Sequence, residues 1–273
     1  LSSAPSSASA NAAMVGWLAN IMRARSVGAR LKAMAGFRMA QLQPVYTLLL
    51  GLTDPVVKLN MGQTAEIVAH RFGLTREAQD AYALQSHQRL AAALDSGVMN
   101  DEITPLYDTR GKVYTFDDGL RRDTDIEQLG RLKPVFDRKY GSVTSGNSSQ
   151  VTDGAGMLML ASEDAVKRHN LPVLGELLGE AWAGVEPGQM GLGPVHAVAK
   201  LLKRFDLKMD DLALMELNEA FAAQVLGCQA AWASPEYARD ELGRERPLGS
   251  MDPPRLNVAG GAAAIGPPVG ASG

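Results

Sequence analysis

The sequence is short of cysteine, of long apolar runs and of the signals that direct a chain to a membrane. Its 273 residues hold one cysteine, Cys228, which excludes an intrachain disulfide framework and favours a reducing compartment. The most apolar stretch, residues 45–52, is too short to cross a bilayer. The first residues lack the basic region and the long apolar core of a secretory signal. A net charge of −3 argues against a nucleic-acid partner, because phosphate binding needs clustered Lys and Arg.

Several common active-site motifs are also missing. The glycine-rich residues 260–273 lack the Lys-Ser/Thr pair of a phosphate-binding P-loop, and the chain contains no G-x-G-x-x-G. No G-x-S-x-G nucleophile turn and no metal-ligand spacing occurs. His70 and His87 have no second ligand at i+4, so we interpret them as helix-surface residues. The sequence therefore predicts no metal site and no tightly bound cofactor.

What is present is the composition of an ordinary globular protein, 46% hydrophobic and 21% charged, long enough for one large or two ordinary domains. Near the start, Val15, Leu18, Ile21 and Met22 recur at helical spacing, and Arg23, Arg25, Arg30 and Lys32 follow them. This pattern predicts a basic amphipathic helical segment. Such a segment either packs on its own protein with solvated arginines or contacts a membrane surface or a partner subunit.

Further along, helix signals alternate with strand signals. Thr75 and Gly97 are typical caps of a helix between them, and residues 108–125 resemble a charged surface excursion. Apolar runs before Ser162, over 171–184 and over 212–217 predict buried strands. Helices are expected over 162–169 and 193–205 and again after residue 218. This alternation from residue 141 onward indicates an α/β fold.

Three polar or glycine-rich loops stand out, each at the junction of a predicted strand and another element: residues 145–149, 218–221 and 260–273. In open α/β architectures, ligands and catalytic groups gather at such junctions. Each loop by itself is weak evidence, because Gly and Ser are common turn residues. Asn218 also has the residue type of an N-cap for the helix that follows it.

In order along the chain, five stretches resemble the thiolase family: NMGQTAEIVAHRFGLTREAQDAYALQSHQRLAAAL, SVTSGNSSQVTDGA, MGLGPVHAVAKLL, NEAFAAQ and GGAAAIGPPVGASG. The residues between Arg23 and Val45, with LKPVFDRKYGSVTSGNSS, most resemble the thiolase subunit of trifunctional complexes of fatty-acid β-oxidation. Those subunits commonly carry His-Glu-Ala-Phe where this chain has Asn218. The thiolase-type motifs make a ketoacyl synthase the less favoured relative.

The resemblance implies the layered α-β-α-β-α fold of thiolases, in an incomplete form with a largely helical loop domain. Residues 1–145 would be mainly that loop domain, 146–170 the end of the N-terminal domain, and 171–273 part of the C-terminal domain. The resemblance also implies a chain truncated at both ends, whose N-terminal sheet lacks strands and exposes apolar surface.

Thiolases move acyl groups between coenzyme A and 3-ketoacyl-CoA, with a cysteine nucleophile activated by a histidine and a second cysteine as acid and base. Carried over, the two cysteines would lie before Leu1 and after Gly273, and Cys228 matches neither. We interpret Cys228 as a small buried hydrophobic residue. Pro267 occupies the position of the histidine in the family's Gly-His-Pro, and proline has no proton acceptor on its side chain.

Apart from the two cysteines and the histidine, the resemblance assigns residues of this chain to the coenzyme A side of the cleft and to one catalytic position. Asn218 matches the asparagine that holds the water of the oxyanion hole. Substrate contacts are implied for six residues: Ser149, Met61, Met190, Phe221, Ala220 and Gly266. By themselves, Phe221 and Met190 are more often core residues than pocket walls, and the Gly-Asn-Ser-Ser stretch that holds Ser149 is ordinary turn material. Coenzyme A and acyl-CoA enter as substrates.

The sequence therefore favours a thiolase-family acyltransferase of fatty-acid β-oxidation or acetoacetyl-CoA metabolism, with this chain an inactive fragment. The alternative is a non-catalytic thiolase-like protein that binds acyl-CoA or serves as a structural subunit. Family likeness implies a homo-oligomer, with a hydratase/dehydrogenase subunit as a further partner, and neither nucleic acid nor a transmembrane segment. The expected location is the cytoplasm, with the mitochondrial matrix or a peripheral membrane association as alternatives.

Overall fold

The computed structural model describes residues 12–24, 26–42, 50–268 and 270–272. Two compact units divide the chain: one comprises Ala4–Asn60, and the other comprises Met61–Gly273 with Leu1–Ser3. Arg25, the Ser/Ala-rich start and most of the apolar stretch at 45–52 lie outside the described residues. The boundaries expected at residues 145 and 170 stay a prediction.

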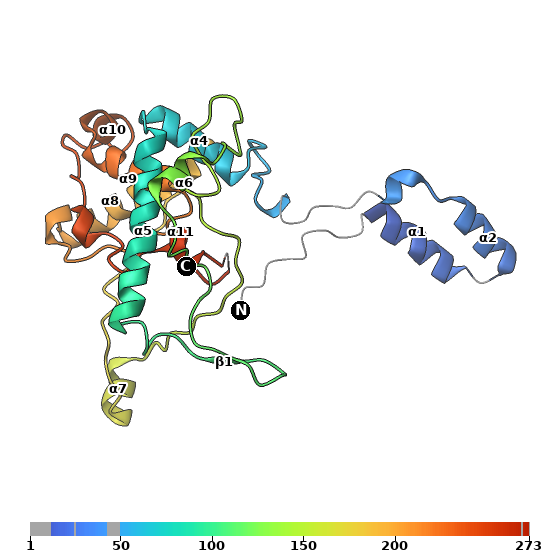
Figure 1. Ribbon diagram of the computed structural model, residues 1–273, viewed down its shortest axis with the longest axis horizontal. Helices are drawn as coiled ribbons and strands as arrows, with labels where there is room; N and C mark the ends of the chain where they lie inside the picture. Colours follow the sequence, from blue (N-terminus) through green and yellow to red (C-terminus); the bar gives the residue numbers. More distant parts are fainter. Residues whose placement is uncertain (1–11, 25, 43–49, 269, 273) are drawn as a thin grey trace. The chain divides into compact units, whose positions relative to one another are not determined.

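The smaller unit holds a helical hairpin, as the apolar spacing near the start predicts (Figure 1). Its elements are α1 (Ala12–Arg23), α2 (Val27–Ala35) and the 3-10 helix η1 (Met39–Leu42). Ser26 caps α2 by accepting a hydrogen bond from the backbone N–H of Ala29 at 3.2 Å. Trp17 joins the helices, because its indole N–H donates to the carbonyl of Ala33 at 2.9 Å.

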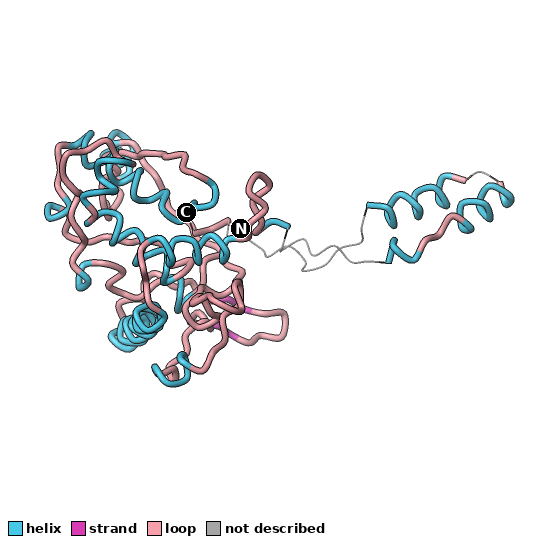
Figure 2. The backbone as a smooth tube through the Cα atoms, turned by 90° about the horizontal axis from the view of Figure 1, so that it is seen from above, coloured by secondary structure: helices cyan, strands magenta, loops and turns pink. Residues whose placement is uncertain are grey.

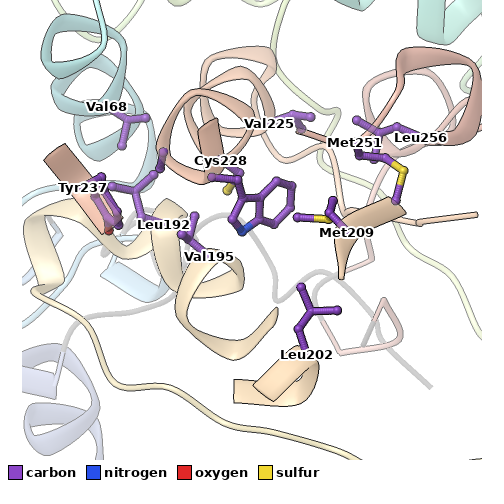
Figure 3. Close-up of a cluster of buried hydrophobic side chains, with 12 residues drawn as sticks. Val68, Leu192, Val195, Leu202, Met209, Val225, Cys228, Tyr237, Met251 and Leu256 are labelled. Atoms are coloured by element: carbon purple, nitrogen blue, oxygen red, sulfur yellow. The ribbon is translucent and has the colours of Figure 1, made fainter. Parts of the chain in front are cut away.

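The regular secondary structure of the larger unit is almost all helical and is arranged around α9 (Ala222–Ala233), which packs against α4, α5, α8 and α10. Trp232 and Cys228 of α9 are fully buried and belong to one hydrophobic cluster with side chains of the surrounding elements. Figure 3 shows Cys228 among Val225, Leu192 and Val195 of this cluster. The burial predicted for Cys228 is confirmed. The other helices are α4 (Met61–Arg71), α5 (Arg76–Ser96), α6 (Ile126–Gly130), α7 (Glu163–His169), α8 (Gly193–Phe205), α10 (Pro235–Asp240) and α11 (Ala262–Ile265), with the 3-10 helices η2 (Pro187–Leu192), η3 (Met209–Asp211) and η4 (Pro253–Arg255).

The predicted helix ends are confirmed where a local cap sets them. The Thr75 hydroxyl accepts from the N–H of Ala78 at 3.2 Å, and α5 ends at Gly97 with φ 76°. Ser162 caps α7 in the same way. The charged segment at 108–125, predicted to lie on the surface, contains one strand of an exposed two-stranded hairpin.

The predicted buried strands are wrong for this structure. The single sheet of the described residues pairs β1 (Leu106–Tyr107) with β2 (Val113–Tyr114) in antiparallel order, Leu106 opposite Tyr114 (Figure 2). The apolar run before Ser162 and the run over 171–184 have no strand and are largely exposed, and 212–217 makes one isolated bridge, Met215 to Leu256. A strand needs neighbouring strands to pair its backbone groups, and among the described residues these three runs have no such partner beyond the single bridge of Met215.

Candidate functional site

The loop at residues 145–149 lies against the loop at 218–221. The N–H of Ser149 donates to the carbonyl of Ala220, and the N–H of Ala222 donates to the carbonyl of Asn147, both at 2.9 Å. Between these bonds, Ser148 and Phe221 form an antiparallel bridge. Two of the three loops singled out in the sequence are therefore joined backbone to backbone, directly before α9.

The side chain of Asn147 holds the first loop in place through hydrogen bonds. Its side-chain N–H group donates to Asp80 of α5 at 2.8 Å, and its side-chain oxygen accepts from the N–H of Thr144 at 2.8 Å. Asp80 is also paired with Arg76 at 2.7 Å. Because Asn147 is completely buried, these bonds satisfy groups that have no access to water.

The third loop contacts the residues that directly follow the first loop. The side-chain amide of Gln150 donates to the carbonyl of Ala264 at 3.3 Å. Gly266 has φ 90°, and a Cβ at this position would overlap the side chain of Thr152. Glycine is required here both for the backbone conformation and for the close approach. The third loop thus contacts residues 150 and 152, directly after Ser149.

A buried carboxylate joins the second and third loops. Glu219 is 1% exposed, and each of its oxygens accepts hydrogen bonds. Tyr82 and Asn257 donate to Oε1 at 2.8 Å, while Ser86 donates to Oε2 at 2.6 Å. The N–H of Ala263, in α11, also donates to Oε2 at 3.1 Å. Hydrogen bonds to a charged acceptor are about twice as strong as neutral ones, so Glu219 clamps the loops against α5.

The start of the third loop lies directly on α5. Gly260 has φ 79°, and a Cβ there would lie 2.5 Å from the carbonyl oxygen of Ser86 and 2.8 Å from the N–H nitrogen of Leu90. In Figure 1, α11 lies beside α5, in agreement with the contacts between them. The glycine-rich composition of this loop is therefore explained in part by its approach to a helix of the same chain.

An aromatic pair packs next to the second loop. The rings of Phe221 and Phe136 meet edge to face, with centroids 5.9 Å apart. Both rings pack against a small buried cluster of Ala65, Ala69, Val143 and Ala223. The ring of Phe136 fills the space that a Cβ of Gly62 would need, directly after Met61 at the start of α4. Phe136 thus joins Phe221 to Gly62, the residue that follows Met61.

Met190 is placed by η2, beside the first turns of α9. It is 40% exposed, whereas the backbone of the next residue, Gly191, lies against Gln224 of α9. The thiol of Cys228 donates to the carbonyl of Gly191 at 3.2 Å. Burial raises the pKa of Cys228 to about 12, so the thiol stays protonated and is a poor nucleophile.

The two positions that the resemblance predicts to be catalytic, Asn218 and Pro267, are not buried. Asn218 is exposed, and the prediction that it caps the following helix is wrong, because Phe221 is the N-cap residue of α9. Pro267 is half-buried beside Gly266. The structure joins the loops that carry these residues, and their roles in binding or catalysis stay predictions.

The sequence did not single out Glu219, Tyr82, Ser86 or Asn257 for a role. Burial raises the pKa of the Tyr82 phenol above its usual range, and the neighbouring Glu219 raises it further. The signal that was available is the i,i+4 spacing of Tyr82 and Ser86 on one helix face, together with a glutamate next to Ala220 and Phe221. None of these features reveals a contact between residues more than 130 positions apart.

The exposure of His87 also differs from the prediction. It is 6% exposed, so its interpretation as a helix-surface residue is wrong, whereas His70 is exposed as predicted. Burial lowers the pKa of His87, and Arg121 lowers it further. The N–H of Arg121 donates to Nδ1 of His87 at 3.3 Å, which a neutral imidazole can accept. Within the described ranges, no group of three or more His, Cys, Asp or Glu side chains is arranged to hold a metal ion.

Two family models match nearly the whole chain. The thiolase N-terminal domain matches residues 10–164, and the thiolase C-terminal domain matches residues 171–273. The chain is 40% identical over 258 residues to a 3-ketoacyl-CoA thiolase of Pectobacterium carotovorum, covering 94% of this chain and 58% of that protein. It is 43% identical over 230 residues to the mitochondrial 3-ketoacyl-CoA thiolase of Rattus norvegicus, covering 83% and 53%.

Solved structures give the same result. The acetyl-CoA acetyltransferase of Bacillus anthracis matches with a TM-score of 0.76 at 35% identity, over 87% of this chain and 56% of that one. Human mitochondrial 3-ketoacyl-CoA thiolase in complex with CoA matches with a TM-score of 0.74 at 39% identity, over 91% and 57%. The chain therefore belongs to the thiolase family and has a thiolase-like α/β fold. It spans about 58% of the length of the bacterial relative.

Proposed function

We propose that this chain is part of an acyltransferase that moves acyl groups between coenzyme A and 3-ketoacyl-CoA. The observation that carries the proposal is the junction of three thiolase-type loops, in which Ser149 bonds to Ala220 and Glu219 clamps the glycine-rich loop. The family match and the CoA bound in a human relative support coenzyme A as the substrate. The substrates and activity of the whole protein are proposals, because this chain spans little more than half of its relatives.

The proposed roles divide between binding and charge stabilisation. Ser149 contacts the pantetheine arm, and Met61, Met190 and Phe221 provide apolar contacts along it. Ala220 and Gly266 offer backbone close to the thioester. Asn218 orients a water that donates to the enolate or carbonyl oxygen as negative charge develops there. A donor fixed in advance stabilises that charge without reorganising during the reaction.

Acyl exchange between sulfur atoms needs a thiolate, and this chain offers none at the site. Its one cysteine is Cys228, which is buried in the core with its pKa raised to about 12. We therefore propose that the chain by itself binds coenzyme A without turning it over. The expected measurement is no thiolysis of acetoacetyl-CoA above the buffer rate, for the chain and for its Cys228→Ala variant alike. Turnover that disappears in Cys228→Ala would contradict this assignment.

Coenzyme A binding is the direct test. We expect isothermal titration to detect binding by the chain, and Ser149→Ala to weaken it about fivefold, which corresponds to one hydrogen bond of about 1 kcal/mol. Ser145→Ala is the matched control, because Ser145 is exposed in the same loop and carries no proposed contact. Absence of binding by the parent chain, or equal weakening in both variants, would contradict the proposed site.

A second candidate, a non-catalytic acyl-CoA-binding or structural protein, is favoured by Pro267. Proline supplies neither a base nor a side-chain donor where the family places histidine. A chimera that supplies both cysteine loops of a thiolase relative separates the two functions. If the site is catalytic, Pro267→His in that chimera raises acyl transfer at least about a hundredfold, the scale of one general base. Equal rates with and without the substitution would favour the non-catalytic function.

We propose a homo-oligomer, with a hydratase/dehydrogenase subunit as a further partner, on family likeness alone. Among the described helices, none has the length and apolar character needed to cross a membrane. A location in the cytoplasm or the mitochondrial matrix is a proposal, supported for the matrix by the name of the rat relative.

A further inference from the structure

Residues 150–154 lie beside residues 264–268 and contact them in steps of two. Each contact joins one residue of the first segment to one residue of the second, and the pairs are Gln150 with Ala264, Thr152 with Gly266, and Gly154 with Pro268. The three contacting residues of the first segment are half-buried, whereas the residues between them are exposed. Alternate residues of an extended segment face the same side, so one face of 150–154 lies against the third loop.

Thr152 makes the middle contact, and its hydroxyl lacks a partner. A Cβ at Gly266 would lie 2.5 Å from Oγ1 of Thr152, so this oxygen lies directly against the backbone of Gly266. Among the described residues, no group forms a hydrogen bond with this buried oxygen. A buried polar group without a partner costs free energy, which is why native proteins contain few of them.

The third loop offers no free backbone N–H beside this hydroxyl. The N–H of Gly266 is already used, because it donates to the carbonyl of Ala262 at 2.9 Å. The next two residues are Pro267 and Pro268, and proline has no backbone N–H. Every other residue type at position 267 would bring an N–H into the loop, directly after the residue that Thr152 contacts.

We propose that Thr152 is a positioning residue for position 267, and that its hydroxyl is the acceptor for a backbone N–H that Pro267 lacks. The contacts at 264 and 268, on either side, hold the two segments together, so the hydroxyl stays beside this part of the loop. The loop is therefore complementary to a residue other than proline. A residue with an N–H at position 267 would be held by this bond, and its side chain would be oriented with it.

The catalytic consequence of this pairing rests on the proposed function. Position 267 is where an added histidine is expected to raise acyl transfer, and a catalytic group needs a fixed geometry. The pairing itself does not depend on coenzyme A, because it rests on contacts within the chain. Loss of the pairing and loss of coenzyme A binding are therefore separate outcomes of separate measurements.

An ordered water is the other way to satisfy the hydroxyl. A buried water typically bonds to about three polar groups, and such waters are costly to remove. In that case the hydroxyl would stabilise the chain with proline at position 267. A hydroxyl without a partner has no bond to lose there, so the two explanations predict different results for the same substitution.

A double-mutant cycle between positions 152 and 267 tests the proposal. Thr152→Val keeps the shape of the side chain and removes the hydroxyl. In the parent chain it should leave the equilibrium constant of urea unfolding unchanged or lower it, because no bond is lost and a buried polar group is removed. In the Pro267→Ala background it should raise that constant about fivefold, the net effect of one neutral hydrogen bond. Thr152→Ser keeps the hydroxyl, so its cycle with Pro267→Ala should show no coupling.

Pro268→Ala is the matched control. It introduces an N–H at the neighbouring proline, which packs on Gly154 rather than on Thr152, so its cycle with Thr152→Val should show no coupling. Pro267→His provides a second cycle at position 267, because any residue with a backbone N–H there should couple in the same way.

Amide hydrogen exchange measures the bond directly. The N–H of residue 267 in Pro267→Ala should be protected, and adding Thr152→Val should accelerate its exchange at least about fivefold, whereas adding Thr152→Ser should not. A loss of stability on Thr152→Val in the parent chain would overturn the proposal and favour the ordered water. Equal coupling at positions 267 and 268, or exchange at residue 267 that does not respond to Thr152→Val, would overturn it as well.

Discussion

Two apolar regions of the larger unit differ in their exposure to solvent. Around α9, apolar side chains from five helices enclose Trp232, which has no exposed surface. In the segments at 157–160 and 174–182, side chains of the same kind lie in solvent: Met157 is 96% exposed, Leu174 98% and Trp182 83%. Apolar composition alone therefore does not decide burial.

The difference lies in where the backbone hydrogen bonds are made. A helix pairs its N–H and C=O groups within one segment, so α9 satisfies its own backbone while it offers an apolar surface to its neighbours. A strand pairs with other strands, and the described residues bring none to these two segments. The predictions below test this contrast.

Replacing the two tryptophans gives the largest expected difference. Trp232→Ala should lower the free energy of unfolding by about 3–5 kcal/mol, because it removes a large buried side chain and leaves a cavity. Trp182→Ala should change it by less than about 0.5 kcal/mol, the range of ordinary surface substitutions. Urea unfolding followed by circular dichroism measures both. Equal losses would show that the exposed segment is packed in solution.

The buried carboxylate gives the next largest effect. Glu219→Gln should destabilise the larger unit by about 2 kcal/mol, because the amide presents an N–H group to donors that then lack an acceptor. Glu176→Gln, in the exposed segment, is the matched control and should be close to neutral. Amide hydrogen exchange at Ala263 should accelerate in Glu219→Gln only. Unchanged exchange there would contradict the clamp.

Acidification should weaken the larger unit by a smaller amount. Burial lowers the pKa of His87 and of His196 in the folded state. Below the ordinary histidine pKa of about 6.5, the unfolded chain then binds more protons than the folded chain. The stabilisation that the neutral imidazole rings contribute is therefore fully present above this pKa. It declines as the pH falls through this pKa. His87→Gln should flatten this decline, measured as urea midpoints from pH 7.5 to 5.5, whereas the exposed His70→Gln should not.

The exposed segments should affect solubility more than stability. Leu158→Ser with Leu160→Ser should leave the unfolding free energy unchanged and reduce light scattering on concentration, because an exposed apolar patch drives association. Leu192→Ser, which changes a side chain 1% exposed in the α9 core, is the contrasting variant and should unfold the unit more readily. Lower stability in the double serine variant would show that the segment is buried after all.

The sequence by itself determined the features that depend on neighbours along the chain. Thr75 and Ser162 cap helices through contacts three residues away, and Gly97 ends α5 because it adopts a left-handed conformation. The ordered motifs determined the family, and the three loops predicted as a site are in contact. In each case the physical cause acts over a few residues, or over a motif that the whole family shares.

Only the tertiary structure decided which polar groups are buried and which apolar runs are covered. Glu219 meets Tyr82 across 137 positions and Ser86 across 133, and these partners explain its burial. His87 is buried and accepts a hydrogen bond from the backbone N–H of Arg121, 34 positions away. The apolar runs predicted as strands stay exposed, since strand pairing depends on distant segments. Burial and strand formation are set by groups far apart in sequence, which local patterns do not encode.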